Sequence, residues 1–213
     1  MSLLLLEHKT LFLEKLIDKK LLGYFLNSFL FIFTDNILKM LPVLRMDIYN
    51  FDKILLIPSN LIIQILFIVK YHFNQQFKIL SCVTGIDFPK NKHRFQAVYD
   101  LLSIKYNSWV KLKILIHELI PVESAEIVFP SISWWESEIW DMFGIFFINH
   151  SNITRLLTDY GFIGYPLWKD FPLNGFTEVR YHPLKNWIVY ENLELAQEYR
   201  EFDFLSPWEI YKD

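Results

Sequence analysis

Cysteine is almost absent from this chain of 213 residues, and so are the short motifs that hold cofactors. The single cysteine, Cys82, cannot form an internal disulfide, and no CxxC pair exists to hold zinc or an iron–sulfur cluster. Neither GxGxxG nor GxxxxGK[ST] occurs, so nucleotide binding has no support from the sequence. The histidines form no HExxH motif and no pair at ligand spacing, which argues against a metal site.

Long apolar runs and an excess of one charge are also missing. The net charge of -3 gives no basic footprint for nucleic acid. A membrane-spanning helix needs about 20 apolar residues, but residues 21–33 are too few and residues 54–69 are interrupted by polar side chains. Yet 53% of the residues are hydrophobic and 18% are aromatic, which is high for an independent domain. We therefore expect one domain plus a tail, with part of the surface covered by partner proteins.

The amino terminus does not look like a targeting signal. Residues 1–20 contain Glu7, Glu14 and Asp18, and no arginine precedes Arg45, which argues against a transit peptide. No positive region precedes the short leucine run, which argues against a secretory signal. Alanine and arginine are rare, whereas Phe, Ile, Leu, Lys and Asn abound. An A+T-rich genome favours this usage, so we expect an organelle gene.

Hydrophobic periodicity predicts an α+β fold, a mostly antiparallel sheet with helices against one face, followed by an extended irregular C-terminal tail. Residues 1–41 are predicted to form an N-terminal helical segment, with a helix over 3–20. The α+β domain at 42–130 should begin with a hairpin of strands near 44–48 and 53–57, connected by 50–52. A helix capped by Ser59 or Asn60 should continue to about Phe73, burying one stripe that comprises Ile62, Leu66, Val69 and Phe73.

Three further strands are expected in this domain. Residues 77–83 form the first, and Gly85, Asp87 and Pro89 then provide turn residues. Residues 94–101 and 110–116 alternate between apolar and polar side chains, which predicts adjacent antiparallel strands joined around Asn107. One face of the resulting sheet should belong to the core.

A helix over residues 133–143 opens the region 131–177. Ser133 and Glu136 have the spacing of a capping box, and Gly144 can end the helix in a left-handed conformation. Residues 159–175 are too rich in Gly and Pro for regular structure. The tail at 178–213 should be extended, apart from a helical turn near 193–200, and should need a partner surface for its stability.

Two groups of charged residues leave alternatives open. Glu136, Glu138 and Asp141 could perform acid–base chemistry or serve in capping, solvation or partner contact; a helix places 138 and 141 on one face but 136 about 200° away from 138. Lys169 and Asp170 could be a functional pair or turn residues. Enzymatic activity of the isolated chain is therefore one hypothesis, and membrane-surface binding through the leucine-rich start is another.

The second half of the chain resembles a known family. The run from Glu136 to Gly144 reads ESEIWDMFG, and it is followed by LTDYGF at 157–162, KDFPL at 169–173 and EVRY at 178–181. These motifs closely resemble the signature of the 30-kilodalton subunit of respiratory NADH:ubiquinone oxidoreductase, and the likeness covers roughly residues 43–209. Residues 3–40 carry no diagnostic feature.

The resemblance implies a non-catalytic structural subunit in the quinone module of the peripheral arm of mitochondrial complex I, on the matrix side of the inner membrane. It implies no cofactor here, with flavin and iron–sulfur clusters in neighbouring subunits, and partners that include the 49-kilodalton subunit. The reaction would belong to the whole assembly. Partner contacts are implied for Glu136, Trp140, Asp141, Phe143, Asp159, Tyr160, Gly161, Lys169, Asp170, Phe171, Pro172 and Arg180.

Several positions depart from the family pattern. Ser137 stands where the family usually has arginine, Tyr165 where it has histidine and Trp168 where it has arginine. The family sequence His-Pro-Asp-Leu-Arg-Arg is replaced by HSNITR at 150–155. Each change removes a charge or a turn former, so a bidentate ion pair through position 137 is not available.

Overall fold

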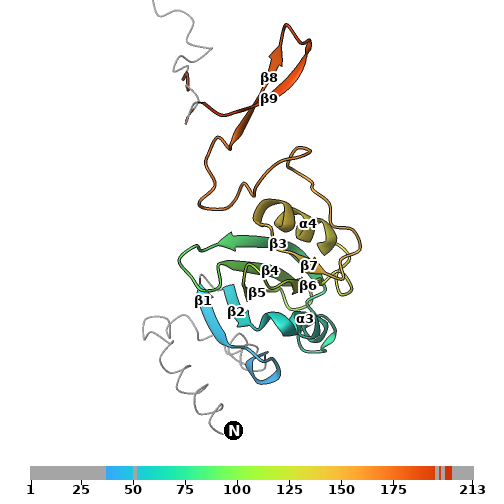
Figure 1. Cartoon of the computed structure of the whole chain (residues 1–213). Helices are drawn as coiled ribbons and strands as arrows, with labels where there is room; N and C mark the ends of the chain where they lie inside the picture. The colour runs from blue at the N-terminus through green and yellow to red at the C-terminus, as the bar shows by residue number, and fades with distance from the viewer. Residues whose placement is uncertain (1–36, 50–51, 195–196, 198–199, 203–213) are drawn as a thin grey trace, which may run out of the picture. The chain divides into compact units, whose positions relative to one another are not determined.

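The computed structural model describes residues 37–49, 52–194, 197 and 200–202 (Figure 1). The chain divides into two compact units, Met1–Tyr165 and Pro166–Asp213. The helix predicted over residues 3–20 lies outside the described residues, as do parts of the helical turn predicted near 193–200. Within the described ranges, no helix is both long enough and apolar enough to cross a membrane.

A five-stranded sheet forms the centre of the first unit, in the order β1-β2-β5-β4-β3. All neighbouring strands are antiparallel except β2 and β5, which run parallel. The paired strands of the predicted hairpin and the predicted pair of long strands are confirmed; of the connection predicted at 50–52, residues 50–51 lie outside the described residues and Asp52 belongs to β2. The strands are β1 (Arg45–Tyr49), β2 (Asp52–Ile57), β3 (Ile79–Asp87), β4 (Phe95–Ser103) and β5 (Ser108–Ile116).

One face of this sheet is the core. In β4 and β5, Tyr99 lies opposite Leu112 and Ala97 opposite Ile114, and all four side chains are fully buried. Among the described residues, helices α3 (Ile62–Tyr71) and α4 (Ile132–Phe143) add buried side chains to this core, and α4 lies beside β3 (Figure 1). The predicted α+β class with a mostly antiparallel sheet is therefore confirmed.

The helix after β2 differs from the prediction at both ends. A short 3-10 turn, η1 (Ser59–Leu61), precedes α3, and no side chain caps either element, so capping by Ser59 or Asn60 is wrong. The helix ends at Tyr71, and the chain then turns so that Phe77 enters the core; its N–H donates to the carbonyl of Val69 at 3.1 Å. Phe73 is therefore exposed instead of lying on the buried stripe.

Gly85 and Asp87 lie in a strand, not in the predicted turn. Strand β3 continues to Asp87, and the reversal comes after Phe88. Asp87 is buried and accepts two hydrogen bonds from the guanidinium of Arg94, at 2.8 and 3.0 Å. A side chain at Gly85 would place its Cβ 2.7 Å from the ring of Phe143. Glycine is used here because α4 approaches the sheet closely, not because the chain turns.

Two smaller strand pairs complete the structure. In the first unit, β6 (Val122–Glu123) pairs in parallel with β7 (Phe147–Ile148), which joins the chain before α4 to the chain after it. In the second unit, β8 (Thr177–His182) and β9 (Trp187–Asn192) form an antiparallel hairpin. The extended conformation of this tail was predicted, but the pairing of its two strands was not.

Filling the space above Gly85 tests the contact between helix and sheet. We expect Gly85→Ala to lower the free energy of unfolding by about 1–3 kcal/mol, because the ring of Phe143 must move to admit a methyl group. Urea unfolding of the purified chain measures this. Gly85→Ala should cost less stability when residue 143 is leucine, so the difference between Gly85→Ala/Phe143→Leu and Phe143→Leu should be smaller than that between Gly85→Ala and wild type. Equal costs of Gly85→Ala with Phe and with Leu at 143 would contradict the contact.

Candidate functional site

Helix α4 carries the central part of the family-like sequence, and it ends as predicted but begins differently. Gly144 has φ 74°, and its N–H donates to the carbonyl of Trp140, so the left-handed end is confirmed. The helix starts one residue earlier than predicted, after Ser131, and no side chain caps it. The capping box of Ser133 and Glu136 is therefore wrong, because Ser133 lies within the helix and the Glu136 side chain is engaged elsewhere.

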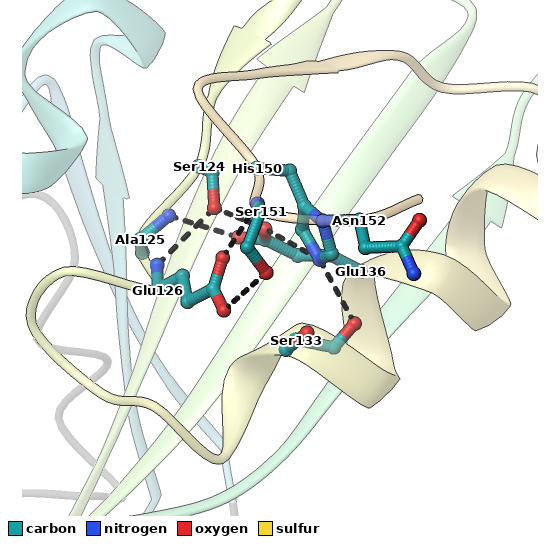
Figure 2. A network of polar contacts seen from close by, with 8 residues as sticks. All are labelled: Ser124, Ala125, Glu126, Ser133, Glu136, His150, Ser151 and Asn152. Carbon is teal, nitrogen blue, oxygen red and sulfur yellow. Dashed lines mark hydrogen bonds and ion pairs between the residues drawn. The ribbon is translucent and has the colours of Figure 1, made fainter. Parts of the chain in front are cut away.

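Glu136 is fully buried and binds the chain that precedes the helix (Figure 2). One carboxylate oxygen accepts a hydrogen bond from Ser124 Oγ at 2.5 Å, and the other accepts from the N–H of Ala125 at 2.9 Å. Ser124 Oγ also accepts from the N–H of Glu126 at 3.2 Å. The carboxylate thus fixes residues 124–126 against α4.

His150 and Glu126 attach the chain that follows β7 to the same network (Figure 2). Nδ1 of His150 accepts from the N–H of Asn152 at 3.1 Å, so the ring proton belongs on Nε2, which lies 3.1 Å from the carbonyl of Ser133 and 3.9 Å from Glu136. The carboxylate of Glu126 accepts from the N–H and the hydroxyl of Ser151, at 2.9 and 2.7 Å.

Ser151, which donates both hydrogen bonds to Glu126, stands at a position where the chain departs from the family pattern. A proline there would offer neither an N–H nor a hydroxyl to Glu126. At another such position, the ring of Tyr165 lies so close to Gly144 that a Cβ on the glycine would be 2.6 Å away. Ser137 is buried within the helix. At these three positions, the residues that depart from the family pattern are therefore accommodated by contacts within this chain.

Asp141 organises the loop that contains LTDYGF. Its Oδ2 accepts from the N–H groups of Leu156, Leu157 and Thr158 at 3.2, 2.9 and 3.0 Å, and its Oδ1 accepts from the hydroxyl of Thr158. Arg155 approaches to 4.0 Å. A buried carboxylate with this many donors acts as an anchor for the loop backbone.

Burial and hydrogen bonds move the pKa values of the two carboxylates in opposite directions. Burial acts to raise the pKa of Asp141, but the hydroxyl of Thr158 and three backbone N–H groups outweigh it, so the pKa lies below its usual value. For Glu136 burial dominates, and the pKa is raised in spite of the hydrogen bonds from Ser124 and Ala125. Asp141 is therefore the stably charged anchor of the two.

The loop beyond this anchor presents an exposed tip. Tyr160 is 98% exposed, and Gly161 has φ 71° with no atom within 4 Å of the place where a Cβ would lie. The tip is closed by a hydrogen bond from the N–H of Phe162 to the carbonyl of Asp159 at 3.2 Å. Arg155 donates to the carbonyl of Phe162 at 3.0 Å, so the anchor and the tip are linked.

The predicted contact residues divide between the two units. Glu136, Trp140, Asp141 and Phe143 lie on α4, with Phe143 against Phe95 in the core at 6.5 Å between ring centroids. Asp159, Tyr160 and Gly161 form the loop tip. The remainder belong to the second unit: Lys169, Asp170 and Pro172 in its turns, Phe171 edge-on to Phe176 at 5.2 Å, and Arg180 in β8, paired with Glu191 at 2.7 Å.

The two buried carboxylates of α4, Glu136 and Asp141, do not converge on a common point. Glu136 binds residues 124–125, which precede α4 in the chain, whereas Asp141 binds residues 156–158, which follow it. Among the described residues, no group of three or more His, Cys, Asp and Glu side chains could hold a metal ion. Each of the two carboxylates instead holds a neighbouring segment of the backbone. Sequence spacing did not indicate Ser124, Glu126 or Ser151, because their partners are distant in the chain.

The pH dependence of stability tests the Asp141 anchor. We expect Asp141→Asn to lower the free energy of unfolding near pH 7 by about 1–3 kcal/mol, since loop donors lose a charged acceptor. With its pKa lowered in the fold, the carboxylate stabilises above its unfolded pKa of about 3.9 and loses this effect as pH falls through the folded value. Urea unfolding at several pH values should show the difference between wild type and variant shrinking in acid; a constant difference would contradict the anchor.

Glu136 should show the opposite trend. Because its pKa is raised in the fold, wild-type stability falls as pH rises from the unfolded pKa, about 4.3, towards the folded value. Glutamine does not titrate, so the stability of wild type minus that of Glu136→Gln should decrease across this window. The same urea series measures it, and Glu138→Gln makes the same change at a half-exposed position. A difference that grows with pH would be inconsistent with the burial of Glu136.

Comparison with a family profile and comparison with individual known proteins identify the same family. The profile described as "Respiratory-chain NADH dehydrogenase, 30 Kd subunit" matches residues 55–177. The chain is 46% identical over 186 residues to "NADH-ubiquinone oxidoreductase subunit 9" of Reclinomonas americana, covering 86% of this chain and 91% of that protein. It is 48% identical over 151 residues to "NADH dehydrogenase [ubiquinone] iron-sulfur protein 3" of Beta trigyna, covering 71% and 79%.

A solved structure shares the fold at low sequence identity. A chain of the membrane-bound sulfane sulfur reductase, an archaeal respiratory membrane complex, superimposes with a TM-score of 0.52 and 19% identity, covering 65% of this chain and 82% of that one. This likeness concerns the fold alone. The profile match and the relatives show more, and this chain belongs to the family of the 30-kilodalton subunit of respiratory-chain NADH dehydrogenase.

Proposed function

We propose that this chain is a structural subunit of the quinone module in the peripheral arm of mitochondrial NADH:ubiquinone oxidoreductase. Its role is to assemble and support the quinone-reducing site, and its main partner is the 49-kilodalton subunit. Membership of the family supports a place in the respiratory complex. The structural role is inferred from how the chain uses its own polar groups.

The observation that carries this proposal is the contrast between α4 and the surfaces it supports. The carboxylates of Glu136 and Asp141 are buried and fully engaged with backbone and hydroxyl donors. By contrast, in the loop that Asp141 holds, Tyr160 is 98% exposed and Ile163 is 76% exposed. A chain that uses a buried charge to hold a loop, and leaves large apolar side chains at the surface, has the character of an interaction scaffold.

The β8–β9 hairpin supports the same conclusion within the second unit. The strand register places Val179, Tyr181, Ile188 and Tyr190 on one face, and all four side chains are exposed. The opposite face carries the ion pair of Arg180 and Glu191. An isolated two-stranded hairpin is at best marginally stable in water. We infer that the apolar face is covered by a partner subunit in the assembled complex.

The proposal places the redox cofactors in neighbouring subunits. A cluster of the common types is held by four cysteines or by a mixture of cysteine and histidine, and this sequence has the single cysteine Cys82, in strand β3. The proposed location is the matrix side of the mitochondrial inner membrane, attached through the other subunits. The NADH:ubiquinone oxidoreductase reaction then belongs to the assembly.

Substitution of Gly161 tests this function. We expect Gly161→Val to lower the amount of assembled complex more than the turnover of each complex that does assemble, because a β-branched residue resists the φ of 71° at the loop tip. Asp141→Lys, which removes the loop anchor, should act in the same direction. Native electrophoresis of mildly solubilised membranes gives the amount, and NADH:quinone activity per assembled complex gives the turnover.

Gly161→Asn provides the matched control, since asparagine tolerates the left-handed conformation much better than valine. It should leave most of the assembly intact. Normal assembly of Gly161→Val with reduced turnover per complex would instead assign the loop a role in catalysis. Activity of the purified chain alone would also contradict a purely structural role.

A further inference from the structure

Exposed aromatic side chains gather where α3 ends, a segment outside the sequence motifs at 136–181. Phe73 is 72% exposed and Tyr71 is 67% exposed, and Phe67 stacks on Tyr71 at 5.9 Å between ring centroids. The turn between β4 and β5 lies against them, because the hydroxyl of Tyr106 donates to the carbonyl of Phe73 at 3.0 Å. We call this surface the α3-end patch; it comprises Phe67, Tyr71, Phe73, Ile104 and Lys105.

A positive charge sits on the patch. The ammonium of Lys105 lies 4.7 Å from the ring centroid of Phe73 and 5.3 Å from that of Tyr106. These cation–π contacts hold a flexible side chain at the surface, close to exposed apolar area. The patch therefore combines exposed apolar area with a positive charge, which is complementary to a group that is apolar and negatively charged.

No acidic residue competes for this charge within the segments that build the patch. The sequence has no Asp or Glu between Asp52 and Asp87, nor between Asp100 and Glu118. The exposed Lys78 and Lys105 add positive charge to the same two segments. Because the whole chain has a net charge of -3, this local cationic region stands out from the rest of the protein.

Apolar side chains of the neighbouring strands lie next to the turn. Leu102 pairs with Trp109 across β4 and β5, and with Ile79 across β3 and β4. Trp109 and Ile79 are exposed. They lie on the face of the sheet opposite the core, where the ammonium of Lys111 is already paired with Asp52 at 2.6 Å. Trp109 and Ile79 thus add exposed apolar area beside the turn, and the positive charge of the patch comes from Lys105.

We propose that the α3-end patch docks an acidic, partly apolar segment of a neighbouring subunit in the respiratory complex. A carboxylate of that segment pairs with Lys105, and its apolar side chains cover Phe73 and Tyr71. The inference rests on the proposed function, since it needs the assembled complex. An anionic membrane explains the patch less well, because two exposed lysines contribute only about 1 kcal/mol each at such a surface.

Carbodiimide cross-linking of the purified intact complex tests the docking directly. This reagent joins an amine to a carboxylate only when they are in contact, and mass spectrometry identifies the joined peptides. We expect Lys105 to be linked to an Asp or Glu of another subunit. The link should be lost in Lys105→Glu and reduced several-fold in Phe73→Ala. Lys92→Glu and Tyr49→Ala, at exposed positions outside the patch, should leave it unchanged.

Two outcomes would overturn the docking while leaving the proposed function in place. In the first, the chain is present in the purified complex, yet Lys105 forms no link to another subunit and is acetylated as fast as Lys92. In the second, the chain binds phosphatidylserine vesicles through Lys105, again without such a link, which would assign the patch to a membrane. Absence of the chain from the purified complex would contradict both proposals.

Discussion

The structure depends most on hydrogen bonds accepted by two buried carboxylates of one helix. Glu136 binds the chain that leads into α4, and Asp141 binds the loop that follows it. Backbone N–H groups in irregular loops have no partner of their own in a strand or helix, and a buried carboxylate can satisfy several of them at once. The loops around α4 can therefore be irregular in sequence and still hold one conformation.

This arrangement requires α4 to have a fixed position on the sheet. The absence of a side chain at Gly85 lets the ring of Phe143 approach β3, and Phe143 also packs against Phe95 in β4. The helix is thus located by apolar packing, and its carboxylates then locate the loops. The exposed Tyr160 lies at the end of this sequence of contacts. The position of the exposed loop tip is in this way set by contacts that begin in the core.

Local patterns in the sequence predicted the main strands in the described part of the first unit. Alternation in residues 94–101 and 110–116 indicated two paired strands, because the period of side chains in a strand is fixed by backbone geometry. The left-handed end of α4 at Gly144 was predicted for a similar local reason. Errors arose where the same residue types serve a tertiary contact: Gly85 permits close packing instead of a turn, and Ser133 and Glu136 match a capping box that does not form.

The sequence by itself determined the fold class, the main strands and, through its long motif, the family. It did so because periodicity, glycine conformation and motif spacing are properties of neighbouring residues. Only the tertiary structure decided that Glu136 would be buried against Ser124 and that Asp141 would bind residues 156–158. Those partners are joined by folding across intervening chain, and no pattern along the sequence specifies which distant donors a buried carboxylate will meet.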